Sequence, residues 1–303
     1  MNYYEQEPGY NSFKTVSIPL TYRCQLKCNN CYLGTMLNNT LEYPDVDYNK
    51  FIDFITALPK RCDIRFIGAE PTMHPNLTDF IKATRAARGH RPSLLTNGVK
   101  LKSLKYTQSL KDAGLNMLGL SMNGGIDDNM YITFDGGPFA KAKMRALENC
   151  IAVGIIPHIN VIISPTNIHV LKPLFDFVVN TLAHYNVRSS TVKFPLAFRI
   201  KSIGKMGNFM EDQSYSLGEL VDTFSRELGV ELNSIDNNID GYNECNSLLA
   251  KFDTDVGQML VKFTDWTVDE HGLPDADNQR RGIMTDDYKV APFFEYYHKE
   301  GVD

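Results

Sequence analysis

Short apolar runs alternate with amphipathic stretches along most of the chain. Residues 14–20 (KTVSIPL) combine apolar and β-branched residues over a length that is typical of a strand. Residues 48–58 (YNKFIDFITAL) carry apolar side chains at helical spacing and stop before Pro59, which favours a helix. The same alternation predicts further strands over 63–67, 93–96, 116–122, 155–163 and 191–200, and further helices over 77–88, 101–113, 139–153, 169–184 and 217–228.

This alternation amounts to six strand–helix units in about 230 residues. Strands that alternate with helices form a parallel sheet whose helices cover its outer face. Because six units fall short of the eight in a complete barrel, we expect an α/β fold, a partial (β/α)6 TIM-like barrel with a C-terminal extension. The loops after the carboxyl ends of such strands meet at one mouth, where we expect the chemistry.

The pattern changes near residue 231, where Asn, Asp and Gly become frequent. In this region only residues 258–266 (QMLVKFTDW) favour a strand, and the end of the chain mixes charged with aromatic side chains. We therefore divide the chain into a barrel core over 1–230 and an extension over 231–303. We expect the extension to cover an open side of the barrel and to contact the substrate.

The charge and hydropathy of the chain disfavour two classes of partner. The net charge is −5 and no run of Lys and Arg exceeds two residues, which disfavours nucleic acid. No segment is both long and apolar enough to span a bilayer, so we expect no membrane association. The first twenty residues hold charged side chains and a proline instead of the apolar core of a signal peptide, so we expect a cytoplasmic protein.

The six cysteines are distributed unevenly, since Cys24, Cys28 and Cys31 fall within eight positions. A disulfide framework would spread its cysteines along a small secreted chain, whereas a tight cluster indicates a metal site. Three thiolates leave one iron atom of a 4Fe-4S cubane without a protein ligand, which favours a cofactor or substrate at that iron. On cysteine chemistry alone, a zinc site with a distant fourth ligand is the alternative.

Residues 20–32 (LTYRCQLKCNNCY) resemble the cysteine signature of the radical S-adenosyl-L-methionine (SAM) superfamily. The resemblance implies that the three clustered cysteines hold a 4Fe-4S cluster whose open iron is chelated by SAM. It further implies reductive cleavage of SAM to a 5′-deoxyadenosyl radical, with electrons from a donor such as flavodoxin or ferredoxin. Asn30 stands where many members have an aromatic residue, so we expect only a main-chain contact to adenine there. Tyr32 follows the third cysteine, as it does in many members.

Motifs at the ends of the later predicted strands also resemble motifs of the superfamily, and they occur in the same order along the chain. Gly68, Ala69, Glu70 and Pro71 resemble the Gly-Gly-Glu-Pro motif that receives the amino group of SAM, with alanine in place of the second glycine. Glu70 would accept a charge-assisted hydrogen bond from the ammonium, although taken alone it could be an exposed capping residue. The other side chains implied to contact SAM are Thr96, Asn97, Ser121, Asn123, Asn160 and Arg199, several of which would otherwise be interpreted as turn or structural residues.

The remaining cysteines bear on the net reaction. Cys62 and Cys150 lie in apolar settings and are interpreted as core residues, while Cys245 stands in a polar stretch of the extension. A tail with a single cysteine does not resemble the auxiliary-cluster tails of the superfamily. It does resemble the tails of its epimerases, in which a lone thiol returns a hydrogen atom to the substrate.

We therefore expect a small-molecule or peptide substrate and a radical reaction that starts with hydrogen abstraction. Epimerisation of a polar compound, such as a sugar-containing metabolite or a peptide, would use Cys245 as the catalytic hydrogen donor. A dehydrogenation or the formation of a carbon–carbon bond is the alternative, in which Cys245 is a bystander. An alternative of another class is a zinc-bound structural or interaction module.

Overall fold

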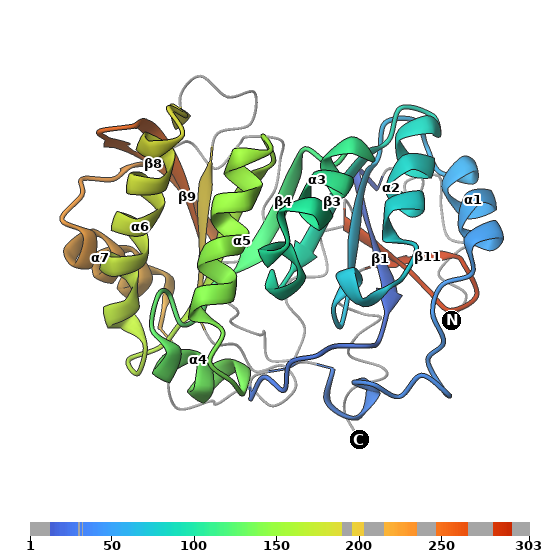
Figure 1. Ribbon diagram of the computed structural model, residues 1–303, viewed down its shortest axis with the longest axis horizontal. Coiled ribbons are helices and arrows are strands. Elements are labelled where there is room, and N and C mark those ends of the chain that lie inside the picture. The colour runs from blue at the N-terminus through green and yellow to red at the C-terminus, as the bar shows by residue number, and fades with distance from the viewer. Residues whose placement is uncertain are drawn as a thin grey trace.

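The computed structural model of the protein describes residues 13–29, 31, 33–189, 196–202, 215–234, 247–265 and 281–292. The strands of these residues form one sheet with the order β11-β10-β1-β2-β3-β4-β5-β6-β9-β8-β7 (Figure 1). Its centre consists of the strands that lead into the predicted mouth. They are β1 (Thr15–Thr21), β2 (Asp63–Gly68), β3 (Arg91–Thr96), β4 (Met117–Ser121), β5 (Ile156–Ile163) and β6 (Ala197–Ser202).

Neighbouring strands from β1 to β6 pair in parallel, as the alternation of strands and helices predicts. Within the described residues the barrel does not close between β6 and β1. Instead, β6 pairs in parallel with β9 (Gly257–Thr264), and β1 pairs in parallel with β10 (Arg281–Met284). The predicted fold, an α/β partial TIM-like barrel, is therefore confirmed.

The described part of the C-terminal region extends the sheet at both edges. β8 (Ser247–Thr254) forms an antiparallel hairpin with β9, and β7 (Asn233–Ser234) lies outside it. At the other edge β11 (Val290–Pro292) pairs antiparallel with β10. The sequence pattern did not predict β10 and β11, because four and three residues are too few to show a periodicity. The division at residue 231 and the substrate-contacting role of the extension stay predictions.

The helices pack mainly on one face of the sheet (Figure 1). Buried aromatic rings of Phe51, Phe66 and Phe80 illustrate this layer, with ring centroids 4.8–6.5 Å apart. Such rings remove much apolar area from water and so stabilise the helix–sheet contact. The helices are α1 (Tyr48–Ala57), α2 (Leu77–Ala86), α3 (Leu104–Asp112), α4 (Asp128–Asp135), α5 (Ala140–Ala152), α6 (Leu171–His184) and α7 (Leu217–Leu228).

Two helices are shorter than the sequence pattern predicts, because a 3-10 helix takes up their first residues. The helix predicted over 101–113 begins only after Ser103, whose hydroxyl accepts a hydrogen bond from Tyr106 N (3.3 Å) and caps α3. The 3-10 helix Val99–Lys102 precedes it, and Ile168–Val170 precedes α6 in the same way.

Helix α4 was not predicted, and its position matters for the site. It begins at the capping residue Asp127, whose carboxylate accepts from Asn129 N (2.8 Å), and it ends at Gly136 in a left-handed conformation (φ 79°). Figure 1 shows it next to the segment that follows β1, and the main chains of the two are hydrogen-bonded. The cysteine loop therefore has a helix beside it that the sequence pattern did not indicate.

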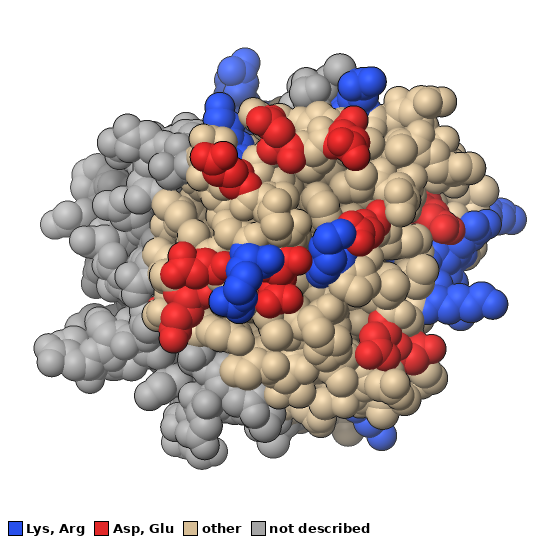
Figure 2. All heavy atoms as spheres, turned by 90° about the vertical axis from the view of Figure 1, so that its left-hand side faces the viewer, with Lys and Arg blue, Asp and Glu red and all other residues tan. Residues whose placement is uncertain are grey.

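The side of the molecule formed by α6 and α7 carries acidic and basic side chains that lie among one another (Figure 2). One exposed pair joins Lys172 Nζ to Asp176 Oδ1 at 2.5 Å on the surface of α6. None of the helices in the described part of the chain is long and apolar enough to cross a membrane.

Candidate active site

The three clustered cysteines lie in the loop that follows β1, at the carboxyl end of that strand. All three are half-buried and form no disulfide. Short contacts shape this loop: Cys24 N donates to Asn38 Oδ1 (2.9 Å), and Leu26 N donates to Cys24 Sγ (3.3 Å). Asn30 and Tyr32, the two predicted SAM contacts of the loop, lie outside the described residues.

Burial disfavours the thiolate form of the three cysteines in this loop. Burial raises the pKa of Cys24 to about 11, although the Leu26 N–H opposes part of the rise. Burial also raises the pKa values of Cys28 and Cys31, and at Cys28 the charge of the Asp135 carboxylate adds to the rise. Iron coordination would displace these protons, because a bound metal stabilises the thiolate form.

The donor set of the loop fits a 4Fe-4S cluster with one open iron. Three half-buried thiols occur within one short loop, and thiolates are the ligands that such clusters prefer. In a cubane each thiolate binds a different iron atom, so the ligands do not converge on one point. In the described part of the chain, no three His, Cys, Asp or Glu side chains are grouped closely enough to hold a single metal ion.

Glu70 is buried just after β2 and receives four hydrogen bonds. Its Oε1 accepts from Thr72 N (3.0 Å), Thr72 Oγ1 (2.6 Å) and Thr96 Oγ1 (2.7 Å), while Oε2 accepts from Asn97 N (2.7 Å). The side chain caps the 3-10 helix Pro71–Met73 but is only 1% exposed, so the alternative of an exposed capping residue is wrong. Burial raises the pKa of Glu70, and the hydrogen bonds oppose that rise.

The Gly-Ala-Glu-Pro motif is joined to the start of the cysteine loop through its main chain. Ala69 N donates to Thr21 O (2.9 Å), and Glu70 N donates to Arg23 O (3.0 Å). Gly68 makes this approach possible, because its φ is 127° and a Cβ there would lie 2.4 Å from Thr21 O. Ala69 has no positive φ, so alanine is tolerated in place of the second glycine.

The end of β3 connects Glu70 with Cys24. Thr96 and Asn97 both bind the Glu70 carboxylate, and Asn97 Nδ2 also donates to Cys24 Sγ at 3.6 Å. Gln25 Nε2 donates to Asn97 Oδ1 (3.1 Å) and so ties the loop to the same strand end. The structure therefore brings four of the predicted site residues together at the carboxyl ends of β1, β2 and β3.

Ser121, Asn160 and Arg199 occupy adjacent positions on β4, β5 and β6. Ser121 is in register with Asn160, and Asn160 is in register with Arg199. Gly119 leaves room for Asn160, because a Cβ at that position would lie 2.5 Å from the side-chain nitrogen. Asn123 Oδ1 accepts a hydrogen bond from a main-chain N–H of β5 (2.9 Å), which fixes this side chain at the end of β4. Cys245 lies outside the described residues.

Two buried charged residues of this region were missed from the sequence. Asp135 Oδ1 lies 3.8 Å from Cys28 Sγ, and Lys143 Nζ lies 2.5 Å from Asp135 Oδ2. Neither residue belongs to a motif. A signal does exist for Lys143, which shares the buried stripe of α5 with Ala140 and Leu147, where a lysine is out of place.

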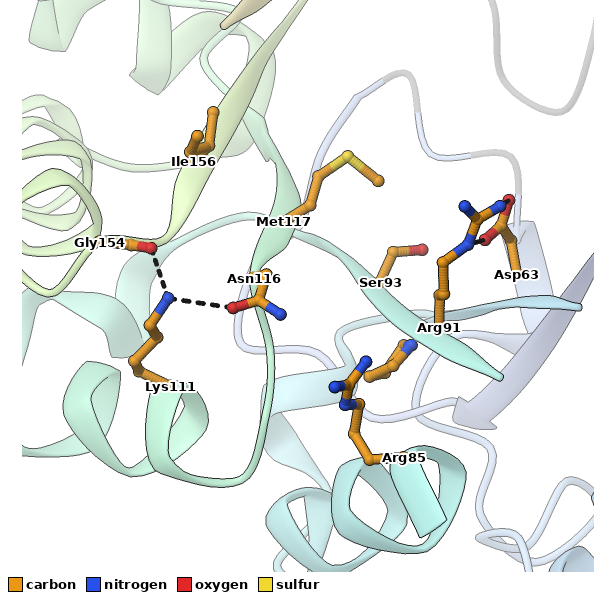
Figure 3. Close-up of a pocket in the computed structure, with 10 residues that line it drawn as sticks. Asp63, Arg85, Arg91, Ser93, Lys111, Asn116, Met117, Gly154 and Ile156 are labelled. Carbon is orange, nitrogen blue, oxygen red and sulfur yellow. Dashed lines mark hydrogen bonds and ion pairs between the residues drawn. The ribbon is translucent and has the colours of Figure 1, made fainter. Parts of the chain in front are cut away.

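A cavity of about 510 Å³ lies apart from this site, near the amino ends of the central strands (Figure 3). Arg91 and Met117, the first residues of β3 and β4, line it, and Arg91 Nε is paired with Asp63 Oδ1 at 2.5 Å. At its edge Lys111 donates to Asn116 Oδ1 (3.0 Å). None of the predicted SAM contacts lines this cavity, and barrels of this type carry their chemistry at the other end of the strands.

About half of the sequence is similar to a known protein family and to individual proteins. The family model described as the radical SAM superfamily matches residues 18–178, slightly more than half of the chain. The 7,8-dihydro-6-hydroxymethylpterin dimethyltransferase of Methanocaldococcus jannaschii is 31% identical over 140 residues, which are 46% of this chain and 28% of that protein. A probable GTP 3′,8-cyclase of Methanococcus aeolicus is 26% identical over 169 residues, or 54% of this chain and 55% of that one. The chain thus spans about half the length of these relatives or less.

Solved structures are similar to this protein in fold. Streptococcus suis SuiB bound to S-adenosylmethionine has a TM-score of 0.59 at 12% identity, over 93% of this chain and 60% of that chain. The structure of anSMEcpe with bound AdoMet and Kp18Cys peptide has a TM-score of 0.51 at 16% identity, over 71% of this chain and 58% of that chain. With the match over residues 18–178, the chain belongs to the radical SAM superfamily, whose members use a 4Fe-4S cluster and SAM.

Proposed function

We propose that the protein is a radical SAM enzyme in which Cys24, Cys28 and Cys31 hold the 4Fe-4S cluster. The bound cluster supplies the electron that breaks a carbon–sulfur bond of SAM. The observation that carries the proposal is the connection of the cysteine loop to the buried Glu70 through Asn97, at the carboxyl ends of the first three strands. A zinc-bound interaction module would not require these contacts, and the family match disfavours it.

Glu70 is the proposed acceptor for the ammonium group of SAM. Its Oε1 already receives three hydrogen bonds and its Oε2 only one, so Oε2 has capacity for a further, charge-assisted bond. The main chain at 68–71 would lie along the same group. The other proposed SAM contacts are Thr96, Asn97, Ser121, Asn123, Asn160 and Arg199, with Asn30 and Tyr32 outside the described residues.

The face of the sheet opposite the helices, which we call the inner face, favours an anionic substrate. Arg65 on β2, His158 on β5, Arg199 on β6 and Lys262 on β9 alternate with residues of the helix-covered core and so face the barrel interior. Burial and the positive charges of Arg199 and Arg65 lower the pKa of His158 to about 3, so these groups lie within electrostatic reach of one another. Of these groups the Arg and Lys side chains are positively charged, and such charges attract anions.

Two buried polar atoms on the inner face support the same substrate class. Ser17 Oγ and His158 Nε2 have no hydrogen-bond partner among the described residues, and Ser17 is in register with Arg65. A buried polar atom without a partner costs free energy, which a ligand oxygen can offset. We therefore propose a substrate with a phosphate or carboxylate group, in keeping with the relatives that are named for GTP. A peptide is the second candidate, since SuiB was solved bound to a precursor peptide.

The charge of the substrate can be tested on the cluster-loaded protein under anaerobic conditions. Phosphorylated metabolites are expected to stimulate 5′-deoxyadenosine formation more than their dephosphorylated forms. For a stimulating compound, Arg65→Gln should raise KM about tenfold or more, because a lost charge-assisted hydrogen bond costs about 1.5–3 kcal/mol. Arg226→Gln, on the exposed surface of α7, is the matched control. Equal stimulation by both forms of each compound would contradict an anionic substrate.

For the net reaction we propose epimerisation with Cys245 as the hydrogen donor. The adenosyl radical would take a hydrogen atom from carbon, and the thiol would return one from the opposite face. The resulting thiyl radical would then need one electron and one proton, with the electron supplied by a donor such as flavodoxin or ferredoxin. The proposal rests on the sequence, since Cys245 lies outside the described residues. A dehydrogenation or carbon–carbon bond formation would leave Cys245 without this role.

The hydrogen donor can be identified by isotope incorporation. In deuterated water the wild-type protein should place one solvent deuterium at the inverted carbon, because thiol protons exchange with water. The Cys245→Ala variant should still form 5′-deoxyadenosine but should yield little inverted product. Cys62→Ala, which changes a cysteine buried in the core, serves as the control and should leave the deuterium incorporation unchanged. Normal product formation by Cys245→Ala would eliminate the donor role.

A further inference from the structure

The last turn of α4 holds the cysteine loop on both sides of Cys28. Asn29 N donates to Phe134 O (2.9 Å), and Lys27 N donates to Asp135 O (3.4 Å). The chain then turns away at Gly136, where a Cβ would lie 2.8 Å from the Lys27 carbonyl oxygen. The main chain next to the middle cysteine is therefore docked on this helix end, with little space between the two segments.

An ion pair buried behind this contact reaches the sulfur atom itself. Asp135 is 1% exposed and Lys143 is fully buried, and their charged atoms are 2.5 Å apart. The second carboxylate oxygen lies 3.8 Å from Cys28 Sγ. Lys143 Nζ also donates to Ser121 O (3.0 Å) and lies 4.8 Å from the centre of the Tyr131 ring. The pair thus spans from the cysteine loop to the carboxyl end of β4.

A buried ion pair contributes little net stability compared with apolar residues of the same size. Removing two charges from water is costly, and apolar residues of similar size often replace a buried pair without loss of stability. Its position next to Cys28 gives it another use. When the thiol becomes a thiolate ligand, the charge of the Asp135 carboxylate 3.8 Å away repels it, and the opposite charge of Lys143, paired with that carboxylate, attracts it.

We propose that Asp135 and Lys143 are a positioning pair for the cluster. They hold Cys28 in place and tune the electrostatic potential at the cluster. The proposal rests on the proposed function, because it takes Cys28 as a cluster ligand. The main-chain oxygen of Asp135 holds the residue before Cys28, and its carboxylate lies next to the sulfur. Lys143 supplies the opposite charge and links this helix end to the main chain of Ser121 on β4. Both residues act through Cys28, because Asp135 lies next to its sulfur and Lys143 is paired with Asp135.

The electrostatic part of the proposal is tested by the midpoint potential of the reconstituted cluster. This potential is measured by redox titration with electron paramagnetic resonance. Asp135→Asn removes a negative charge and should raise the potential, because the reduced cluster carries one more electron. Lys143→Met removes a positive charge and should lower it. The double variant should fall between the two. Lys172→Met and Asp176→Asn, in the exposed pair on α6, should leave the potential unchanged. Shifts of the same sign in both single variants would overturn the electrostatic role.

The double variant also tests positioning if a single variant fails to fold. Asp135→Asn with Lys143→Met removes both buried charges and keeps the size of the side chains. Iron release from this variant to a chelator should be at least about tenfold faster than from the wild type, while the surface double variant should match the wild type. Wild-type iron retention by the buried double variant would overturn the positioning role. A wild-type protein that binds no cluster would instead refute the proposed function.

Discussion

Replacing Cys24, Cys28 or Cys31 with alanine is expected to abolish SAM cleavage. Each thiolate binds one iron of the cubane, so a protein with two of them cannot hold the cluster in a form that leaves only one iron open to SAM. Anaerobically reconstituted wild-type protein should contain about four iron atoms per chain, and each variant far fewer. The formation of 5′-deoxyadenosine with a chemical reductant measures SAM cleavage, and iron and sulfide analysis measures the cluster content.

Cys150→Ala is the matched control for these variants. Cys150 is fully buried in the core, where burial raises its pKa to about 12, and it contributes to packing between helix and sheet. Its replacement should lower stability by about 1 kcal/mol, the usual cost of deleting one small buried group, and should leave the iron content unchanged. If the triple variant of the loop cysteines still formed 5′-deoxyadenosine, the cluster would have to lie elsewhere in the chain.

The contacts around Glu70 could be anticipated because they follow from strand order. Each candidate stands directly after a strand whose length and apolar pattern are visible in the sequence. Once the strands are parallel and sequential, their carboxyl ends must meet, and Glu70, Asn97 and Cys24 become neighbours. The sequence pattern did not predict that Glu70 is buried, because its burial depends on the packing of Thr72 and Thr96 against the carboxylate.

The contact between Cys28 and Asp135 could not be anticipated in this way. The two residues are 107 positions apart, and α4 is a short helix in a stretch without a clear apolar period. Lys143 belongs to no motif, although its place on the buried stripe of α5 was a usable signal. The pairing of β10 with β1 could not be predicted either, because a strand of four residues does not indicate which edge of the sheet it extends.

Replacing Glu70 with glutamine is expected to weaken SAM binding about ten- to a hundredfold. The amide keeps the size of the side chain but loses the charge that would pair with the ammonium, a loss of about 1.5–3 kcal/mol. It would also turn an NH2 group towards donors such as Thr96 Oγ1 or Asn97 N, so stability should fall by about 1–3 kcal/mol. The iron content should stay close to that of the wild type, because Glu70 makes no direct contact with the loop sulfurs.

Thr72→Val separates the two effects of that substitution. Thr72 Oγ1 donates to Glu70 Oε1 (2.6 Å), so valine removes one of the four hydrogen bonds while the carboxylate and its charge remain. Stability should fall by about 1 kcal/mol, and SAM affinity should change far less than in Glu70→Gln. Equilibrium binding of SAM to the cluster-loaded proteins, together with their thermal unfolding, measures both. If Glu70→Gln and Thr72→Val lost stability alike and kept wild-type SAM affinity, Glu70 would be a buried capping residue and the ammonium site would lie elsewhere.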